Sequence, residues 1–174
     1  MKTAHLPILV TSLALLSGCA ATNLPPYAFL PKTVDTTERP VVVSALGEVK
    51  VTKAATKVES HINPENFKTA LTEVIKRANY FGGNTGKSFA LEANIYEASF
   101  PLAGATMRSK LSVHYKLTSS EGKVILDKDI AYEGKATTGE EFFGSARQLK
   151  AFQTTNQGHF NLFLAALKEA LQKQ

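Results

Sequence analysis

The side chains that could do chemistry are few in this sequence, and its single cysteine is the most distinctive of them. Cys19 follows three residues, Leu16, Ser17 and Gly18, of which the last two are small. One cysteine excludes an intramolecular disulfide and a multi-thiolate zinc or iron–sulfur centre. The chemistry open to Cys19 is therefore that of a lone reactive thiol close to the start of the chain.

The first residues have the layout of a secretory signal peptide. Lys2 supplies a short positive start, an apolar stretch runs from Leu6 to Leu16, and small residues precede Cys19. The stretch is short for a membrane crossing, which needs about 20 apolar residues. A cleaved signal is favoured over a permanent transmembrane helix.

The tetrad Leu16-Ser17-Gly18-Cys19 resembles the bacterial lipobox, L-[AS]-[GA]-C. In lipoproteins that carry it, the nucleophilic thiol receives a diacylglycerol, the chain is cut before the cysteine, and the new amine is acylated. The resemblance implies that residues 1–18 are a lipoprotein signal peptide and that Cys19 is the lipidated N-terminus. Two or more acyl chains anchor a protein stably in a membrane. The alternative is an ordinary signal peptide with a chance cysteine.

The residues after the tetrad bear on localisation. Ala20 and Ala21 stand where an aspartate retains such lipoproteins at the inner membrane of enteric-type bacteria. The resemblance therefore implies an outer-membrane lipoprotein whose domain faces the periplasm.

The charge balance is mildly basic. The chain has 20 Lys and Arg against 15 Asp and Glu, and removal of the signal with Lys2 leaves 19 against 15, a net charge of +4. The basic residues are scattered among acids, whereas a nucleic-acid surface would cluster them with aromatics. We expect no nucleic-acid partner, while a weak attraction to anionic head groups or cell-wall polymers stays open.

Composition and length favour one globular domain behind a tether. Four prolines lie in residues 19–40, which predicts a semi-extended, lipidated tether without helix or central strand. At about 3.3 Å per residue it would reach roughly 70 Å. Its apolar residues Tyr27, Phe29 and Leu30 are expected either to dock on the domain or to contact a partner. The domain itself is expected over residues 41–174.

Hydrophobic periodicity predicts the order β-α-β-β-β-α. A first strand, central at its start, begins at Val41, and a helix begins at the capping pair Asn63-Pro64 and ends at Gly82-Gly83. Alternation predicts strands over 89–97, 107–117 and 124–132, and a long helix covers 145–172 with Gly158 as a close approach or a kink. The economical architecture is α+β: a single antiparallel-rich sheet with two helices packed on one face.

Other motifs have weak chemical readings. Gly82 to Ser88 looks like a phosphate-binding loop, but Phe81 stands where that loop needs a glycine, and the segment joins a helix to a strand. Asp127 and Asp129 share a strand face without a third metal ligand. His61, His114 and His159 are expected at the surface or its boundary. We expect no enzyme activity, no metal and no cofactor.

Phe142 and Phe143 are the candidate partner contacts. They follow Glu140-Glu141 in an expected loop over 137–145. Exposed aromatics often anchor interfaces, so the pair is interpreted as a docking element, with the alternative that it covers the end of the core.

The lipobox, the tether and the element order together resemble the small envelope lipoproteins of the YajG and LptE kind, the auxiliary lipoproteins of ABC-type transport systems, and the N-terminal module of curli-secretion lipoproteins. The resemblance implies a non-catalytic adaptor or accessory subunit that binds an envelope protein complex or self-associates. The alternative function is a binding module for lipid, lipopolysaccharide or cell-wall glycan, which a basic concave surface would favour.

Overall fold

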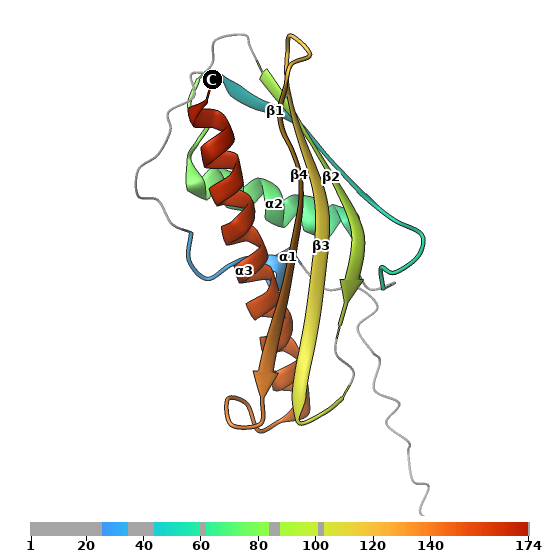
Figure 1. The fold of residues 1–174 in the computed structure, drawn as a ribbon. Helices are drawn as coiled ribbons and strands as arrows, with labels where there is room; N and C mark the ends of the chain where they lie inside the picture. Colours follow the sequence, from blue (N-terminus) through green and yellow to red (C-terminus); the bar gives the residue numbers. More distant parts are fainter. Residues whose placement is uncertain (1–25, 35–43, 60–61, 84–87, 101–102, 174) are drawn as a thin grey trace, which may run out of the picture.

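A four-stranded sheet covered on one side by helices forms this protein (Figure 1). The computed structural model describes residues 26–34, 44–59, 62–83, 88–100 and 103–173. Cys19, the predicted signal peptide, Val41 to Val43, His61 and most of the glycine-rich segment after Gly83 lie outside the described residues.

The sheet has the strand order β1-β2-β3-β4 and is mixed. Strand β1 (Ala45–Lys53) is parallel to β2 (Ser88–Ser99), whereas β2 is antiparallel to β3 (Thr106–Ser119), and β3 to β4 (Val124–Thr137). Two of the three pairings are antiparallel because short turns connect these strands, while a helix connects β1 and β2. β1 is an edge strand, so the prediction that the first strand is central at its start is wrong for Ala45 and Leu46, while Val41 to Val43 lie outside the described residues.

Helix α2 (Pro64–Ala78) begins as its sequence predicts. The Asn63 side chain accepts a hydrogen bond from the Glu65 N–H at 2.8 Å, and proline occupies the first helical position, where no donor is missed. The helix ends four residues earlier than expected, because Asn79 takes the left-handed conformation (φ 54°) as the C-cap. Gly82 and Gly83 therefore lie beyond the end of the helix and do not terminate it.

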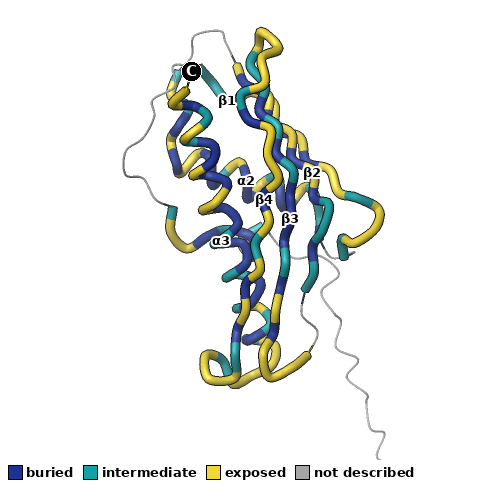
Figure 2. The backbone as a smooth tube through the Cα atoms, in the orientation of Figure 1, coloured by how far each residue is buried: buried dark blue, intermediate teal, exposed yellow. Residues whose placement is uncertain are grey.

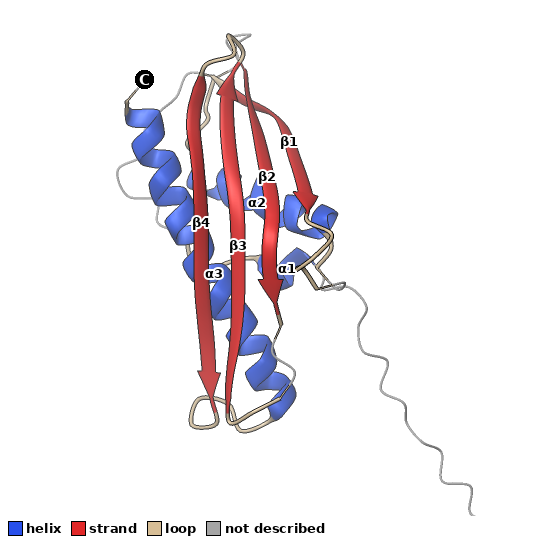
Figure 3. Ribbon diagram, turned by 45° about the vertical axis from the view of Figure 1, so that its right-hand side comes forward, coloured by secondary structure: helices blue, strands red, loops and turns tan. Residues whose placement is uncertain are grey.

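Helix α3 (Gly144–Gln172) lies along the same face of the sheet as α2, as Figure 3 shows. The core between sheet and helices is apolar and continuous, and Figure 2 marks the buried residues of both layers in dark blue. Its largest fully buried side chains include Phe67, Leu71, Tyr115, Phe160 and Phe163. The predicted α+β fold, with one antiparallel-rich sheet and two helices on one face, is confirmed.

Residues 26–34, called the strap below, differ from the expected tether. Pro26–Phe29 forms a one-turn helix, α1, although the prolines predicted no helix there. Proline fits the first turn of a helix, where its missing N–H would be unpaired in any case. Ala28 and Phe29 are fully buried in the core. The strap thus belongs to the packed structure, and Phe29 docks on the domain.

Two glycines let α3 press against β4. A Cβ at Gly134 would lie 2.5 Å from the Thr155 backbone nitrogen, and a Cβ at Gly158 would overlap the Tyr132 ring. The Gly134 N–H also donates to Thr155 Oγ1 at 3.1 Å, so the helix satisfies a donor on the strand. Gly158 therefore marks a close approach to the sheet.

Gly134→Ala is expected to lower the free energy of unfolding by about 1–3 kcal/mol, because the helix backbone must move to admit the methyl group. Gly139→Ala is the matched control, since the nearest atom to its added Cβ lies 3.9 Å away. Urea unfolding followed by circular dichroism measures both. Equal stabilities for the two variants would contradict the close approach.

Candidate functional site

Phe142 and Phe143 project into solvent at the loop between β4 and α3. Their exposed fractions are 82% and 73%, and the rings meet edge to face with centroids 5.8 Å apart. The loop lies at the end of the molecule away from the C-terminus (Figure 1). Neither ring covers the core, because most of each side chain is open to solvent. The alternative reading, that one of the rings caps the core, is therefore not what the structure shows.

Arg147, which is 7% exposed, holds this loop in place. Its Nη1 donates to the carbonyl oxygens of Glu141 (2.9 Å) and Phe142 (3.0 Å), and its Nε donates to the carbonyl of Gly104 (3.1 Å). One guanidinium therefore ties the aromatic loop to the connection between β2 and β3. Charge-assisted hydrogen bonds of this kind are about twice as strong as neutral ones.

The start of the loop is closed by Glu140. Its Oε2 accepts hydrogen bonds from the Thr137 N–H (2.9 Å) and hydroxyl (3.0 Å). These two bonds are the main reason that the pKa of Glu140 lies below its usual value, and the charge of Lys150 adds to the lowering. Hydrogen bonds therefore hold the loop at both ends, and Phe142 and Phe143 extend into solvent from this ordered backbone.

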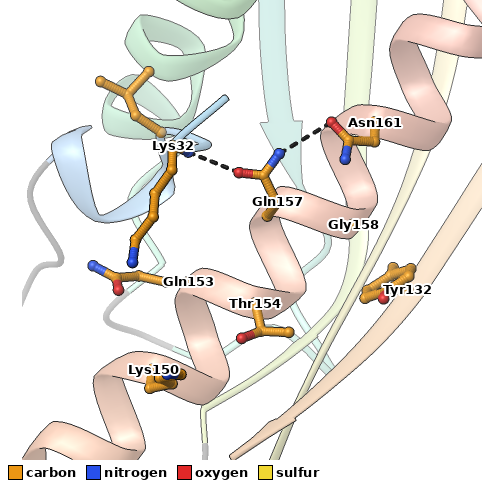
Figure 4. A pocket seen from close by; sticks show the side chains of 9 residues that line it. Lys32, Tyr132, Lys150, Gln153, Thr154, Gln157, Gly158 and Asn161 are labelled. Carbon is orange, nitrogen blue, oxygen red and sulfur yellow. Dashed lines mark hydrogen bonds between the residues drawn. The ribbon is translucent and has the colours of Figure 1, made fainter. Parts of the chain in front are cut away.

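A second feature is a cleft between the strap and the outer surface of α3 (Figure 4). Its volume is about 290 Å³. The strap contributes Leu30 and Lys32, and β4 contributes Tyr132. The α3 residues that line it are Lys150, Gln153, Thr154, Gln157, Gly158 and Asn161.

The strap is pinned to α3 by side-chain amides. Gln157 Oε1 accepts from the Lys32 N–H at 2.7 Å, and Gln157 Nε2 donates to the Thr33 carbonyl at 2.9 Å. Fully buried Asn156 reaches the Ala28 carbonyl at 3.5 Å. The strap wall of the cleft therefore has a defined position.

His159 is completely buried, so the expectation of a surface or boundary position is wrong for this residue. It lies on the sheet-facing side of α3, and its Nε2 is 3.0 Å from the hydroxyl oxygen of Tyr115. Burial lowers the pKa of His159 to about 3, partly opposed by the Leu111 carbonyl, and burial also raises the pKa of Tyr115. The pair is a polar contact inside the core.

His114 lies on β3 between the two aspartates that the sequence singled out. Its Nδ1 is 3.0 Å from Asp129 and its Nε2 is 3.3 Å from Asp127. All three side chains are solvent-exposed. Among the described residues, no group of three or more His, Cys, Asp or Glu side chains is placed to hold a metal ion.

Sequence reasoning named the aromatic pair but missed the cleft and the Arg147 contacts. The polar stripe Lys150, Gln153, Thr154 and Gln157 was visible as an i, i+3, i+4, i+7 pattern on a helix. The sequence does not show that the strap packs beside this stripe. Lipidation at Cys19 stays a prediction, and no helix within the described part of the chain is long and apolar enough to cross a membrane.

No protein-family model matches the sequence, and no curated protein matches it either. Among solved structures, a Xanthomonas campestris protein described under the family model DUF330 aligns with a TM-score of 0.56 at 11% identity, over 81% of this chain and 94% of that one. The two proteins share a fold. At this identity the likeness extends to the fold alone.

Two further structures align less well. The Chlamydia trachomatis protein CT253 aligns with a TM-score of 0.49 at 10% identity, over 75% of this chain and 100% of that one. A minor lipoprotein from Acinetobacter baumannii aligns with a TM-score of 0.38 at 10% identity, over 77% and 94%. At these TM-scores neither likeness carries an argument about this chain.

Proposed function

We propose that this protein is a lipid-anchored lipoprotein of the bacterial outer membrane that acts as a non-catalytic adaptor. Its domain faces the periplasm and docks an envelope assembly or transport complex through Phe142 and Phe143. The observation that carries the proposal is the exposed aromatic pair on a loop that Arg147 and Glu140 hold fixed.

Exposed phenylalanines on a rigid loop suit protein docking. Aromatic side chains are enriched at interfaces, and a pair of them buries a large apolar area when a partner covers it. A loop that is already ordered loses little conformational entropy on binding, so more of the contact energy appears as affinity. The hydrogen bonds of Arg147 and Glu140 supply that order.

The lipid anchor would hold the domain close to the membrane. With the strap docked, six residues lie between Cys19 and Pro26. The seven steps from Cys19 to Pro26 reach at most about 23 Å at about 3.3 Å per residue. This is a third of the reach expected for a free tether of residues 20–40. A short tether raises the effective concentration of the domain at membrane complexes.

Photo-crosslinking from positions 142 and 143 in cells tests the docking surface. A benzophenone side chain at either position is expected to give one adduct of defined mass from the membrane fraction. The matched control is position 124, because Val124 is also an exposed apolar residue (46%) but lies at the opposite end of β4. An adduct at twice the mass of the protein would assign the surface to self-association.

Two variants complete the experiment. Phe142→Ala with Phe143→Ala should reduce recovery of the partner at least tenfold, whereas Val124→Ala should not. Cys19→Ser should block signal processing and membrane retention and remove the adduct. Normal retention of Cys19→Ser would refute the anchor, and equal crosslinking from position 124 would refute the docking surface.

A further inference from the structure

We propose that the cleft between the strap and α3 binds a phosphate-bearing polar group, held between the ammonium groups of Lys32 and Lys150. The group is either a soluble phosphate ester or the headgroup of a phospholipid. The site involves none of the residues of the aromatic loop, so it stands or falls independently of the adaptor function.

The two lysines approach the cleft from different parts of the chain. Lys32 lies on the strap, and its side chain extends beside α3 toward Gln153, one turn beyond Lys150 (Figure 4). Among the described residues, neither lysine has an ion pair, and no acidic residue lines the cleft. The Thr137 hydrogen bonds lower the pKa of Glu140 and the charge of Lys150 adds to this, but Lys150 and Glu140 form no ion pair. Glu140 Oε2 instead accepts two hydrogen bonds from Thr137.

Residues with neutral hydrogen-bond donors line the cleft together with the two lysines. Lys150, Gln153 and Thr154 share one face of α3, because their spacing of three and four residues matches the helical repeat. Gln153, Thr154 and Tyr132 line the cleft, and their side chains carry amide and hydroxyl donors. Phosphate oxygens accept hydrogen bonds from amides and hydroxyls, and bonds from a charged donor are the strongest.

The size of the cleft suits a small ligand. Its volume of about 290 Å³ is just below the range of about 300–1,000 Å³ for small-molecule sites. Gly158 forms part of the wall, and a larger residue there would displace the Tyr132 ring. The strap wall is pre-positioned by its hydrogen bonds to Gln157, which lowers the entropy lost on binding.

Calorimetric titration of the mature, detergent-solubilised protein tests the site with two probes. Glycerol 3-phosphate presents a soluble phosphate ester, and short-chain dihexanoyl phosphatidylglycerol presents a lipid phosphodiester. Saturable binding of one or both is expected, and the tighter probe identifies the source of the phosphate. Glycerol, which lacks the phosphate, should not bind.

Three single variants decide whether the cleft is responsible. Lys32→Gln and Lys150→Gln should each weaken binding at least tenfold and leave the melting temperature unchanged. Lys50→Gln removes the same charge from an exposed position on β1 and should leave binding unchanged. Failure of both probes to bind, binding of glycerol as tight as that of its phosphate, or equal weakening by Lys50→Gln would overturn the proposal.

Discussion

Replacing Phe29 with alanine is expected to lower the free energy of unfolding by about 3–5 kcal/mol, the usual range for a phenylalanine truncated in a core. Phe29 is 0% exposed and packs edge to face on Phe67 and Phe152, with centroids 5.8 and 5.1 Å away. Removing the ring leaves a cavity where the strap, α2 and α3 meet. Urea unfolding of the mature protein, followed by far-ultraviolet circular dichroism, measures the change.

The same variant tests whether the strap is part of the domain. Loss of the ring should release the strap, so that trypsin cuts after Lys32 much faster than in the wild type. Phe143→Ala is the matched control: its ring is 73% exposed, and the change in stability should stay within about 0.5 kcal/mol. If Phe29→Ala matched this control in both stability and proteolysis, the strap would be a free tether.

Acidification from pH 7 to pH 5 is expected to lower the free energy of unfolding by about 2 kcal/mol through His159 alone. The pKa of His159 is about 3 in the folded protein and 6.5 for an unperturbed histidine. Between these values the unfolded chain binds a proton that the folded protein excludes, so stability falls as the pH decreases. The loss begins near pH 6.5 and reaches about 4 kcal/mol near pH 3, at about 1.4 kcal/mol per pH unit.

His159→Gln should remove most of this dependence between pH 7 and pH 5, because glutamine does not titrate and its amide can still reach the Tyr115 hydroxyl. A wild-type slope in His159→Gln would show that other groups cause the acid sensitivity. The comparison stops at pH 5 because carboxylates also titrate below it.

Local sequence accounts for most of the secondary structure. The cap at Asn63, proline at the first helical position and the stripe from Phe67 to Ala78 are short-range features, and they placed the start of α2 correctly. Alternation in β2 from Phe89 to Ile95, and in β3 from Val113 to Leu117, likewise predicted which side chains face the core. Ser112 was predicted to point outward and is buried. These signals are readable because each depends on neighbours within a few residues.

The errors of sequence reasoning share one cause. The prolines of the strap predicted no helix, yet Pro26–Phe29 forms α1. The sequence left open whether Phe29 docks, because the pocket that holds it is made by α2 and α3. His159 reads as a boundary residue because nothing near it in sequence shows that Tyr115, 44 residues away, meets it in the core. Strand β1 was predicted to be central because its apolar run is typical of a buried strand. Such a run does not show how many neighbouring strands it has.

The sequence by itself determined the order of the four strands and two long helices and the α+β class, because these depend on residue types at short spacing. The lipobox at Cys19 rests on the same kind of local pattern and stays a prediction. Only the tertiary structure decided that Phe142 and Phe143 stay exposed, since Arg147 reaches across to Gly104 to hold their loop. It also decided that Lys32 and Lys150, far apart in the chain, line one cleft. Long-range packing brings such residues together, and a local pattern cannot report it.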